Sequence, residues 1–135
     1  MPSHKITRTV HFSYGHRIVG HNGKCRNLHG HNGIVEVDVE SNNLNDLGMV
    51  MDFGNLKNIV EKWIIDNLDH RMILHKDDPA VLSLTELNEP LYILDDNPTA
   101  ENLAQAIYKV LHSMDLNVTE VRFWETLDSR ASYSD

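Results

Sequence analysis

The alternation of hydrophobic and polar positions near the N-terminus predicts two β-strands. Residues 4–13 place mostly apolar side chains on one face and threonine or histidine on the other, with the period of two typical of a half-buried strand. The intervening residues 14–28 are rich in glycine and asparagine, which favour turns. A second alternation begins at His31, and its apolar face consists of Gly33, Val35, Val37 and Val39.

Apolar residues at helical spacing predict two longer helices. The first covers residues 53–67 and follows Asp52, whose carboxylate suits the N-cap position because it can accept from free backbone N–H groups. The second follows Thr99, which can cap it, and carries Glu101 in its first turn, where a negative charge is favourable. Shorter patterns predict a helix over 78–87 and strands over 91–94 and 118–126.

The order of these elements favours an α+β fold with helices packed on an antiparallel sheet. A chain of 135 residues suits a single domain with one core. No apolar run approaches the roughly 20 residues that a membrane-spanning helix needs, and residues 1–10 are too polar for a signal peptide. The single cysteine excludes an internal disulfide, so we expect a cytoplasmic setting.

Charge is distributed unevenly along the chain. The net charge of −8 argues against a general nucleic-acid binder. Residues 1–33, in contrast, contain five Lys or Arg, no Asp or Glu, and six of the nine histidines. This distribution either reflects a solvated surface or provides a local positive field for a small anionic substrate.

The segment 25–31 carries two histidines with one glycine between them. Side chains two positions apart in an extended backbone point the same way, so His29 and His31 can face one metal ion. A catalytic zinc typically takes three protein ligands and keeps one position open. His16 is the favoured third ligand, although spacing alone leaves His4, His11 and His21 as competitors.

Three other side chains are candidates for chemistry. Cys25 has three interpretations: a fourth zinc ligand, a small buried residue or a catalytic thiol. Its neighbours Lys24 and Arg26 favour the catalytic interpretation, because positive charge stabilises a thiolate. In the pair Asp69-His70, the carboxylate can orient the imidazole for proton transfer. Glu125 falls on the apolar face of the last strand, where a carboxylate needs a partner.

Together these segments resemble the 6-pyruvoyltetrahydropterin synthase / 6-carboxytetrahydropterin synthase family. The matches occur in family order over nearly the whole chain, at residues 12–16, 25–31, 48–53, 68–70, 98–104 and 125–126. The resemblance implies a tunnelling fold, in which a four-stranded antiparallel sheet carries two helices on one face. It also implies a homohexamer, a dimer of trimers with active sites at subunit boundaries.

The resemblance implies a role for each candidate side chain. Zinc would be held by His16, His29 and His31. Proton transfer would involve Cys25 as general base, with Asp69 and His70 as a second pair. The pterin pocket would include Glu125, Thr99 and Glu101, with the Glu125 carboxylate accepting from the guanidine-like edge of the pterin.

The resemblance also implies the substrate, 7,8-dihydroneopterin triphosphate, which suits the basic N-terminal third. The favoured product is 6-carboxy-5,6,7,8-tetrahydropterin of the queuosine pathway, and the alternatives are 6-pyruvoyltetrahydropterin and a non-enzymatic, zinc-stabilised pterin-binding module. The triphosphate could be bound by Lys24, Arg26, Arg17 or Arg71. Two departures from the family pattern are Tyr14-Gly15, where the family has a small pair, and His75, where it has asparagine.

Overall fold

The computed structural model describes residues 3–135, which form one sheet and three α-helices. The strands are β1 (His4–His16), β2 (His29–Ser41), β3 (Arg71–His75), β4 (Leu91–Leu94), β5 (Val118–Thr126) and β6 (Ser129–Tyr133). The helices are α1 (Phe53–Asn67), α2 (Ala80–Glu86) and α3 (Ala100–His112), with a short 3-10 turn, η1 (Lys24–Arg26), between β1 and β2.

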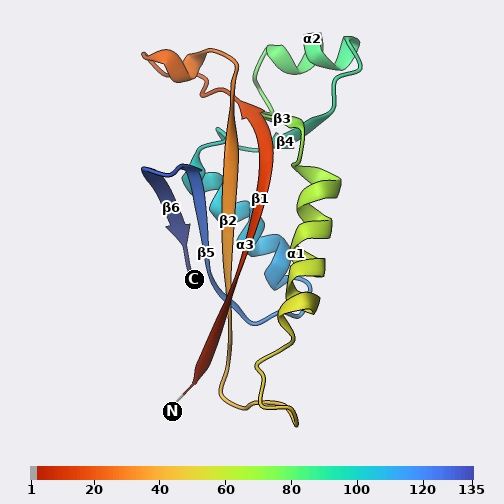
Figure 1. Cartoon of the computed structure of the whole chain (residues 1–135). Helices are drawn as coiled ribbons and strands as arrows, with labels where there is room; N and C mark the ends of the chain where they lie inside the picture. The colour runs from red at the N-terminus through yellow and green to blue at the C-terminus, as the bar shows by residue number, and fades with distance from the viewer. Residues whose placement is uncertain (1–2) are drawn as a thin grey trace.

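Two long strands, β1 and β2, form the centre of the sheet (Figure 1). They pair antiparallel over their whole length, from His4 opposite Ser41 to His16 opposite His29. The strand order is β4-β3-β1-β2-β5-β6, in which β3 runs parallel to the end of β1 and β4 runs parallel to β3. The sheet is therefore mixed at one edge and antiparallel elsewhere.

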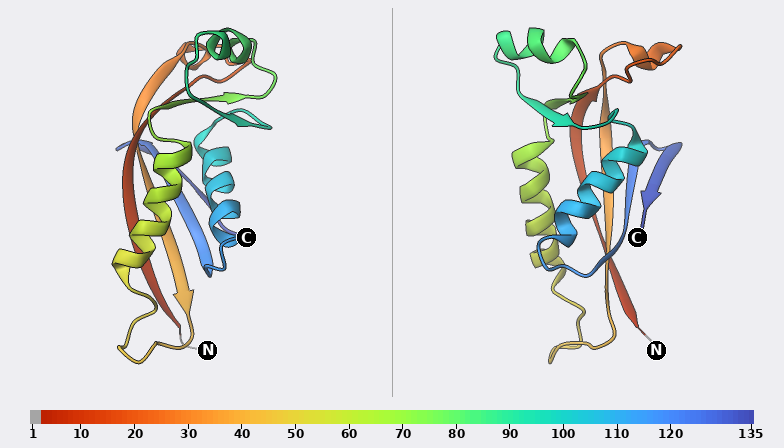
Figure 2. Two further views of the ribbon diagram at one scale, coloured as in Figure 1. Left: turned by 90° about the vertical axis from the view of Figure 1, so that its right-hand side faces the viewer. Right: turned by 180° about the vertical axis from the view of Figure 1, so that it is seen from behind.

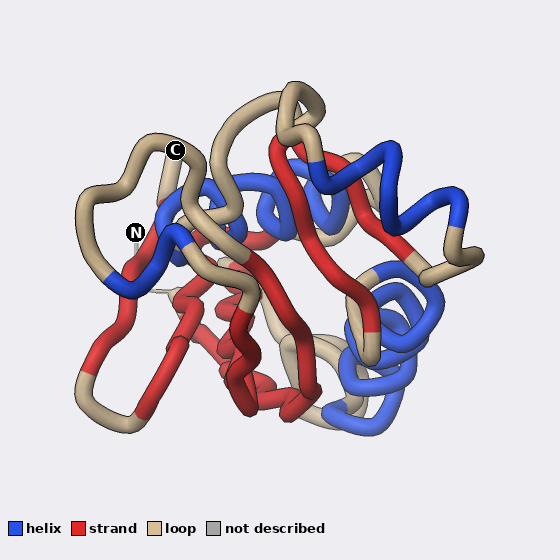
Figure 3. The backbone as a smooth tube through the Cα atoms, turned by 90° about the horizontal axis from the view of Figure 1, so that it is seen from above, coloured by secondary structure: helices blue, strands red, loops and turns tan. Residues whose placement is uncertain are grey.

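Helices α1 and α3 cover one face of the curved sheet, as both views in Figure 2 show. The apolar stripe of α1, formed by Leu56, Val60 and Ile64, is fully buried in the core, where the helix packs against β1. Removing such side chains from water is the main favourable contribution to folding. Figure 1 shows that α2 lies apart from these two helices, beyond the end of β1, and Figure 3 looks onto this end of the sheet. No helix in residues 3–135 is long and apolar enough to span a membrane.

The N-caps of both long helices are confirmed. The Asp52 carboxylate accepts from the backbone N–H groups of Gly54 at 2.7 Å and Asn55 at 3.2 Å, so α1 begins where the sequence predicts. The Thr99 hydroxyl accepts from the Asn102 N–H at 3.1 Å at the start of α3. These contacts are local, which explains why the sequence reveals them.

The α+β class is confirmed, but the expected four-stranded antiparallel sheet is wrong in strand number and direction. The structure adds β3 and β6, and its β1–β3 and β3–β4 pairings are parallel. Strand β3 has only five residues directly after a helix, and β6 has the mostly polar sequence SRASY. Neither presents an apolar alternation. Strand β3 is determined by its pairing with β1 and β4, and β6 is a mostly polar edge strand that pairs with the adjacent β5.

Candidate metal centre and active site

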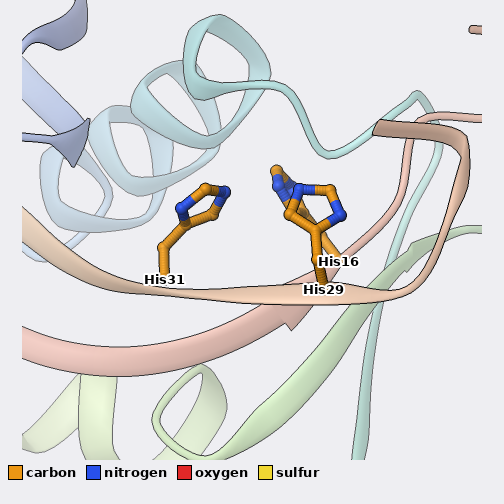
Figure 4. Close-up of side chains that lie close together, drawn as sticks. All are labelled: His16, His29 and His31. Carbon is orange, nitrogen blue, oxygen red and sulfur yellow. The ribbon is translucent and has the colours of Figure 1, made fainter. Parts of the chain in front are cut away.

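Three histidines converge at the end of the β1–β2 pair. His16 lies directly opposite His29, and His31 lies opposite Tyr14, so these side chains emerge on the same, helix-covered face of the sheet. One ring nitrogen from each of His16, His29 and His31 lies within 4.8 Å of the others. Figure 4 shows the three rings projecting from adjacent strands into one region. The strand register therefore brings together the three predicted metal ligands.

Backbone carbonyl groups fix the tautomers of two of these rings. His16 Nδ1 lies 2.7 Å from the Pro98 carbonyl oxygen, and His29 Nδ1 lies 2.7 Å from that of Asn27. Because a carbonyl only accepts, each Nδ1 carries the proton and donates it, which leaves the Nε2 lone pair free for a metal. In residues 3–135, the buried Nε2 atoms of His16 and His31 have no hydrogen-bond partner.

The surroundings favour the neutral form of the His16 and His31 rings. Burial lowers the pKa of His16 to about 4, against the opposing effect of the Pro98 carbonyl and with help from the other two histidines. Burial also lowers the pKa of His31, although the nearby carboxylate of Glu125 opposes the shift. Metal binding requires the neutral ring, so the site needs little deprotonation before an ion can bind.

The donor set suits a zinc ion with an open coordination position. Over the described range 3–135, these histidines form the one cluster of three or more potential ligands that lie close enough to share an ion. Cys25 is outside that cluster, which argues against the alternative of a closed structural site with Cys25 as fourth ligand. Three imidazoles and a free position are typical of catalytic zinc centres.

The loop that carries Cys25 is fastened at several points to the body of the protein. Cys25 is partly buried in η1, and its carbonyl accepts from the Ile18 N–H at 2.7 Å. The Asn97 side chain accepts from the Val19 N–H and donates to the Val19 carbonyl, both at 3.0 Å. The loop is thus closed on itself by the Ile18–Cys25 bond and tied to the segment before α3 by the Asn97 side chain.

An ion pair provides a further anchor at the start of this loop. Arg17 donates through Nε to Asp78 Oδ2 at 2.8 Å and through Nη2 to Asp78 Oδ1. The Asp78 side chain is fully buried, and its bonds to Arg17 hold the pKa of the carboxyl below the ordinary range. Arg17 is therefore occupied structurally and is a poor candidate for binding a triphosphate. Arg71 is also engaged, because its Nη2 donates to the Asp66 carbonyl at 2.9 Å.

Asp69 and His70 form the expected hydrogen-bonded pair. His70 Nδ1 lies 2.8 Å from Asp69 Oδ2, while Asp69 Oδ1 accepts from the Ser13 N–H at 3.0 Å. Burial raises the pKa of Asp69, but the bonds from Ser13 and His70 outweigh it and hold the carboxyl below its ordinary pKa. A left-handed backbone at His70, with φ of 57°, leaves its ring largely exposed.

His70 lines a groove of about 430 Å³ together with Met72, Leu84 and Leu87. No hydrogen bond or ion pair within residues 3–135 joins the Asp69-His70 pair to the metal-site histidines or to Cys25. The structure therefore forms the predicted pair without bringing the whole set of predicted catalytic residues into contact.

Glu125 finds its partner beside the metal site. Its Oε1 lies 3.3 Å from His31 Nε2, and about a quarter of its side chain remains exposed. Thr99 is tied to the same region through its neighbour Pro98, whose carbonyl accepts from His16. Glu101 is exposed in the first turn of α3. Of the pterin-pocket candidates, Glu125 thus contacts a ring of the histidine cluster, Thr99 follows the residue that holds His16, and no hydrogen bond or ion pair within residues 3–135 places Glu101 there.

The sequence alone does not identify Asn97 and Pro98 as part of the site. Together they hold the Cys25 loop and the His16 ring, from a position just before α3. In the sequence, an Asn-Pro pair indicates only the end of the preceding strand. These contacts span about 80 residues of chain, and no local pattern encodes them.

The fold and the site together define an α+β protein with a three-histidine metal centre at the end of a helix-covered sheet. The family model described as 6-pyruvoyl tetrahydropterin synthase matches residues 5–135. The chain belongs to this family, which confirms the resemblance seen in its motifs.

Relatives that share one name match nearly the whole chain. The chain is 40% identical over 129 residues to a 6-carboxy-5,6,7,8-tetrahydropterin synthase of Rickettsia typhi, covering 90% of this chain and 94% of the relative. It is 35% identical over 140 residues to the enzyme of that name from Haemophilus influenzae, covering 97% and 99% of the two chains. Since the family and these relatives are named as synthases, the expectation of an enzyme is confirmed.

Solved structures show the same fold. An uncharacterized protein from Wolinella succinogenes superposes with a TM-score of 0.87 at 28% identity, covering 100% of this chain and 99% of the other. The 6-pyruvoyl tetrahydropterin synthase of Caenorhabditis elegans superposes with a TM-score of 0.74 at 25% identity, covering 100% and 97%. The overall fold is therefore shared across nearly the full length of these proteins.

Proposed function

We propose that the protein converts 7,8-dihydroneopterin triphosphate into 6-carboxy-5,6,7,8-tetrahydropterin, with release of triphosphate and acetaldehyde. The observation that carries this proposal is the convergence of His16, His29 and His31, with two rings held as the Nε2-binding tautomer. The names of the relatives support the choice of product, since the chain is up to 40% identical to them over nearly its full length.

Zinc is the proposed cofactor, held by the three histidines, and when bound it supplies Lewis-acid polarisation of the substrate's side-chain oxygens. The Cys25 thiolate is the proposed base that removes a proton from the side-chain carbon. Asp69 holds the Nδ1 side of His70, so the exposed Nε2 side of that ring is free to exchange a proton with the substrate. The two proposed proton-transfer groups, Cys25 and His70, thus belong to different segments of the chain.

Glu125 is the proposed pterin anchor. An ionised carboxylate accepts two parallel N–H bonds, which matches the guanidine-like edge of a pterin. Its position 3.3 Å from a metal-ligand ring would place the bound pterin beside the metal site. Thr99 and Glu101, at the start of α3, are proposed to border the same pocket.

The active site is proposed to be completed by a second copy of the chain. Cys25 and His70 have no direct contact with the histidine cluster in residues 3–135, and His70 lines an open groove. Assembly as a dimer of trimers, as the family resemblance implies, would bring such groups together at subunit boundaries. Lys24 and Arg26 are the proposed triphosphate contacts, because Arg17 and Arg71 are already engaged.

A second candidate function is formation of 6-pyruvoyltetrahydropterin, which requires loss of triphosphate without release of acetaldehyde. It is supported by the likeness to the C. elegans enzyme, whose fold covers the whole chain. A third is a non-enzymatic, zinc-stabilised pterin-binding module. The proposed setting is the queuosine pathway in the cytoplasm, where a lone thiol such as Cys25 stays reduced.

The deciding experiment is incubation of the purified, zinc-loaded protein with 7,8-dihydroneopterin triphosphate, followed by product mass and an acetaldehyde assay. The proposal predicts one acetaldehyde for each triphosphate released. Triphosphate without acetaldehyde would favour the pyruvoyl product. Pterin binding with no turnover would favour the binding module and contradict the enzymatic proposal.

A further inference from the structure

A buried hydroxyl without a partner lies beside the metal site. Tyr14 on β1 is only 4% exposed, and its hydroxyl oxygen is inaccessible to solvent. No other atom of residues 3–135 forms a hydrogen bond with this hydroxyl. A buried, unpaired polar group opposes folding. Because this hydroxyl lies beside the proposed metal site, we look for its role in that site.

The Tyr14 ring is fixed in place by its neighbours. It lies opposite His31 in the strand register, with ring centroids 5.6 Å apart, and meets the ring of His16 edge-on at 5.2 Å. Phe123 of β5 packs against it at 5.4 Å. Gly33 leaves the space that the ring occupies, since a Cβ at that position would lie 3.0 Å from Tyr14 Cε1. Its hydroxyl therefore has a defined position.

Tyr14 and Glu125 both lie against the ring of His31. A neutral phenol donates one hydrogen bond, and an ionised carboxylate such as that of Glu125 can accept it. In the structure, Glu125 Oε1 instead lies 3.3 Å from His31 Nε2. That nitrogen is the atom that His31 would offer to a metal, and binding there would remove the proton that could pair with the carboxylate.

We propose that Tyr14 is a positioning residue for Glu125, whose carboxylate accepts the Tyr14 hydroxyl hydrogen bond once His31 Nε2 is taken by the metal. The carboxylate would then be held toward the pterin edge, and the unpaired hydroxyl would gain its partner. The inference rests on the proposed pterin site, because it assigns Tyr14 an effect on pterin binding that is exerted through Glu125.

The test compares Tyr14→Phe, which removes only the hydroxyl, with the unmodified protein. The probe is neopterin, a fully oxidised, fluorescent pterin, and its dissociation constant is measured by fluorescence titration on zinc-loaded protein. We expect Tyr14→Phe to raise this constant roughly tenfold, as expected for loss of a hydrogen bond to a charged group. The zinc content should stay the same. In the metal-free protein, where the hydroxyl is unpaired, the melting temperature of Tyr14→Phe should be equal to or higher than that of the unmodified protein.

Tyr92→Phe is the matched control. Tyr92 is a half-buried tyrosine whose ring packs edge-on against that of Trp63, away from the histidines. This variant should bind neopterin like the unmodified protein. An equal loss in Tyr92→Phe would mean that the effect is a general consequence of removing a tyrosine hydroxyl, and would overturn the inference.

A double-mutant cycle with Glu125→Ala shows whether Tyr14 acts through the carboxylate. In the Glu125→Ala background, adding Tyr14→Phe should not weaken neopterin binding further. An additive loss would place the hydroxyl directly on the ligand and overturn the positioning role, as would unchanged affinity in the single Tyr14→Phe variant. Failure of the unmodified protein to bind neopterin would overturn the proposed function as well, which separates the two failures.

Discussion

His16 Nδ1 donates to the carbonyl oxygen of Pro98 across 82 positions of the chain, at a distance of 2.7 Å. This bond links the end of β1 to the residue before the cap of α3, and it fixes the tautomer in which the buried Nε2 can bind a metal. The neighbouring Asn97 grips the loop that carries Cys25. One short segment before a helix thus positions both a proposed metal ligand and a proposed base.

Substitution Asn97→Asp should loosen the Cys25 loop. It removes the Nδ2 donor to the Val19 carbonyl and places a carboxylate oxygen beside that carbonyl instead. We expect a loss of about 1–3 kcal/mol in the free energy of unfolding and faster alkylation of Cys25 by iodoacetamide. The exposed substitution Asn58→Asp on α1 is the control. Equal alkylation rates in the two variants would show that Asn97 does not restrain the loop.

Metal content should depend on the clustered histidines and not on histidine number. His29→Ala removes one of the three converging nitrogens and should reduce bound zinc from one per chain to well below stoichiometric amounts. His11→Ala is the control, since His11 lies on β1 but is exposed and outside the cluster. The measurement is elemental analysis after dialysis, and zinc retained by His29→Ala would remove that residue from the ligand set.

Asp69→Asn should impair turnover far more than folding. Its remaining side-chain oxygen can still accept from the Ser13 N–H, but the charge that holds and stabilises the His70 ring is lost. We expect kcat to fall by about 10²–10⁴-fold with little change in KM, the range seen when an acid–base group is disabled.

Asp77→Asn is the matched control for that prediction, because Asp77 is also a carboxylate beside a histidine, 3.9 Å from His75 Nδ1. Its kcat should stay close to that of the unmodified protein. If Asp69→Asn were as active as Asp77→Asn, Asp69 and His70 would have no part in proton transfer.

Asp38 should make stability depend on acid pH. Burial raises its pKa, but hydrogen bonds from Arg122 and Thr7 outweigh burial and lower it below the ordinary value. A depressed pKa adds stability that is complete above the ordinary aspartate range, near pH 4, and is lost as pH falls through the lowered value. Denaturant unfolding between pH 7 and pH 3 should therefore show a steeper acid loss for the unmodified protein than for Asp38→Asn.

At pH 7, Asp38→Asn should cost about 3 kcal/mol in the free energy of unfolding, because it breaks a buried pair and leaves Arg122 short of one carboxylate. The remaining contacts of Arg122 to Glu36 and Glu120 limit the loss. Exposed Asp46→Asn should leave stability and its pH dependence unchanged. Parallel acid curves for Asp38→Asn and the unmodified protein would contradict the assignment of the shift to Asp38.

The parts of the structure that could be predicted from the sequence are those with local causes. The bounds of α1 follow from its apolar stripe and the Asp52 cap, and the shared face of His29 and His31 follows from the period of a strand. The mostly polar edge strand β6 lacks an apolar alternation and could not be predicted. Strand β3 could not be predicted either, since its pairing with the distant β1 determines it. The same holds for the contact of Asn97 with Val19, which joins residues 78 positions apart.

The site shows the same division. Spacing indicates the histidine pair, and the turn after α1 places Asp69 next to His70, so these candidates are visible in the sequence. The partner of Glu125 and the unpaired hydroxyl of Tyr14 depend on how β1, β2 and β5 are aligned, and no single segment specifies that alignment. The alignment of the strands, and not composition, therefore determines which side chains surround the histidine cluster.

The central claim is that the histidines hold the metal while Cys25 moves a proton. It is tested most directly by measuring zinc content and turnover of 7,8-dihydroneopterin triphosphate together on Cys25→Ala. The account predicts one zinc per chain, an unchanged melting temperature, and a loss of turnover of about 10²-fold or more. Loss of stoichiometric zinc from this variant, or turnover at the rate of the unmodified protein, would contradict it.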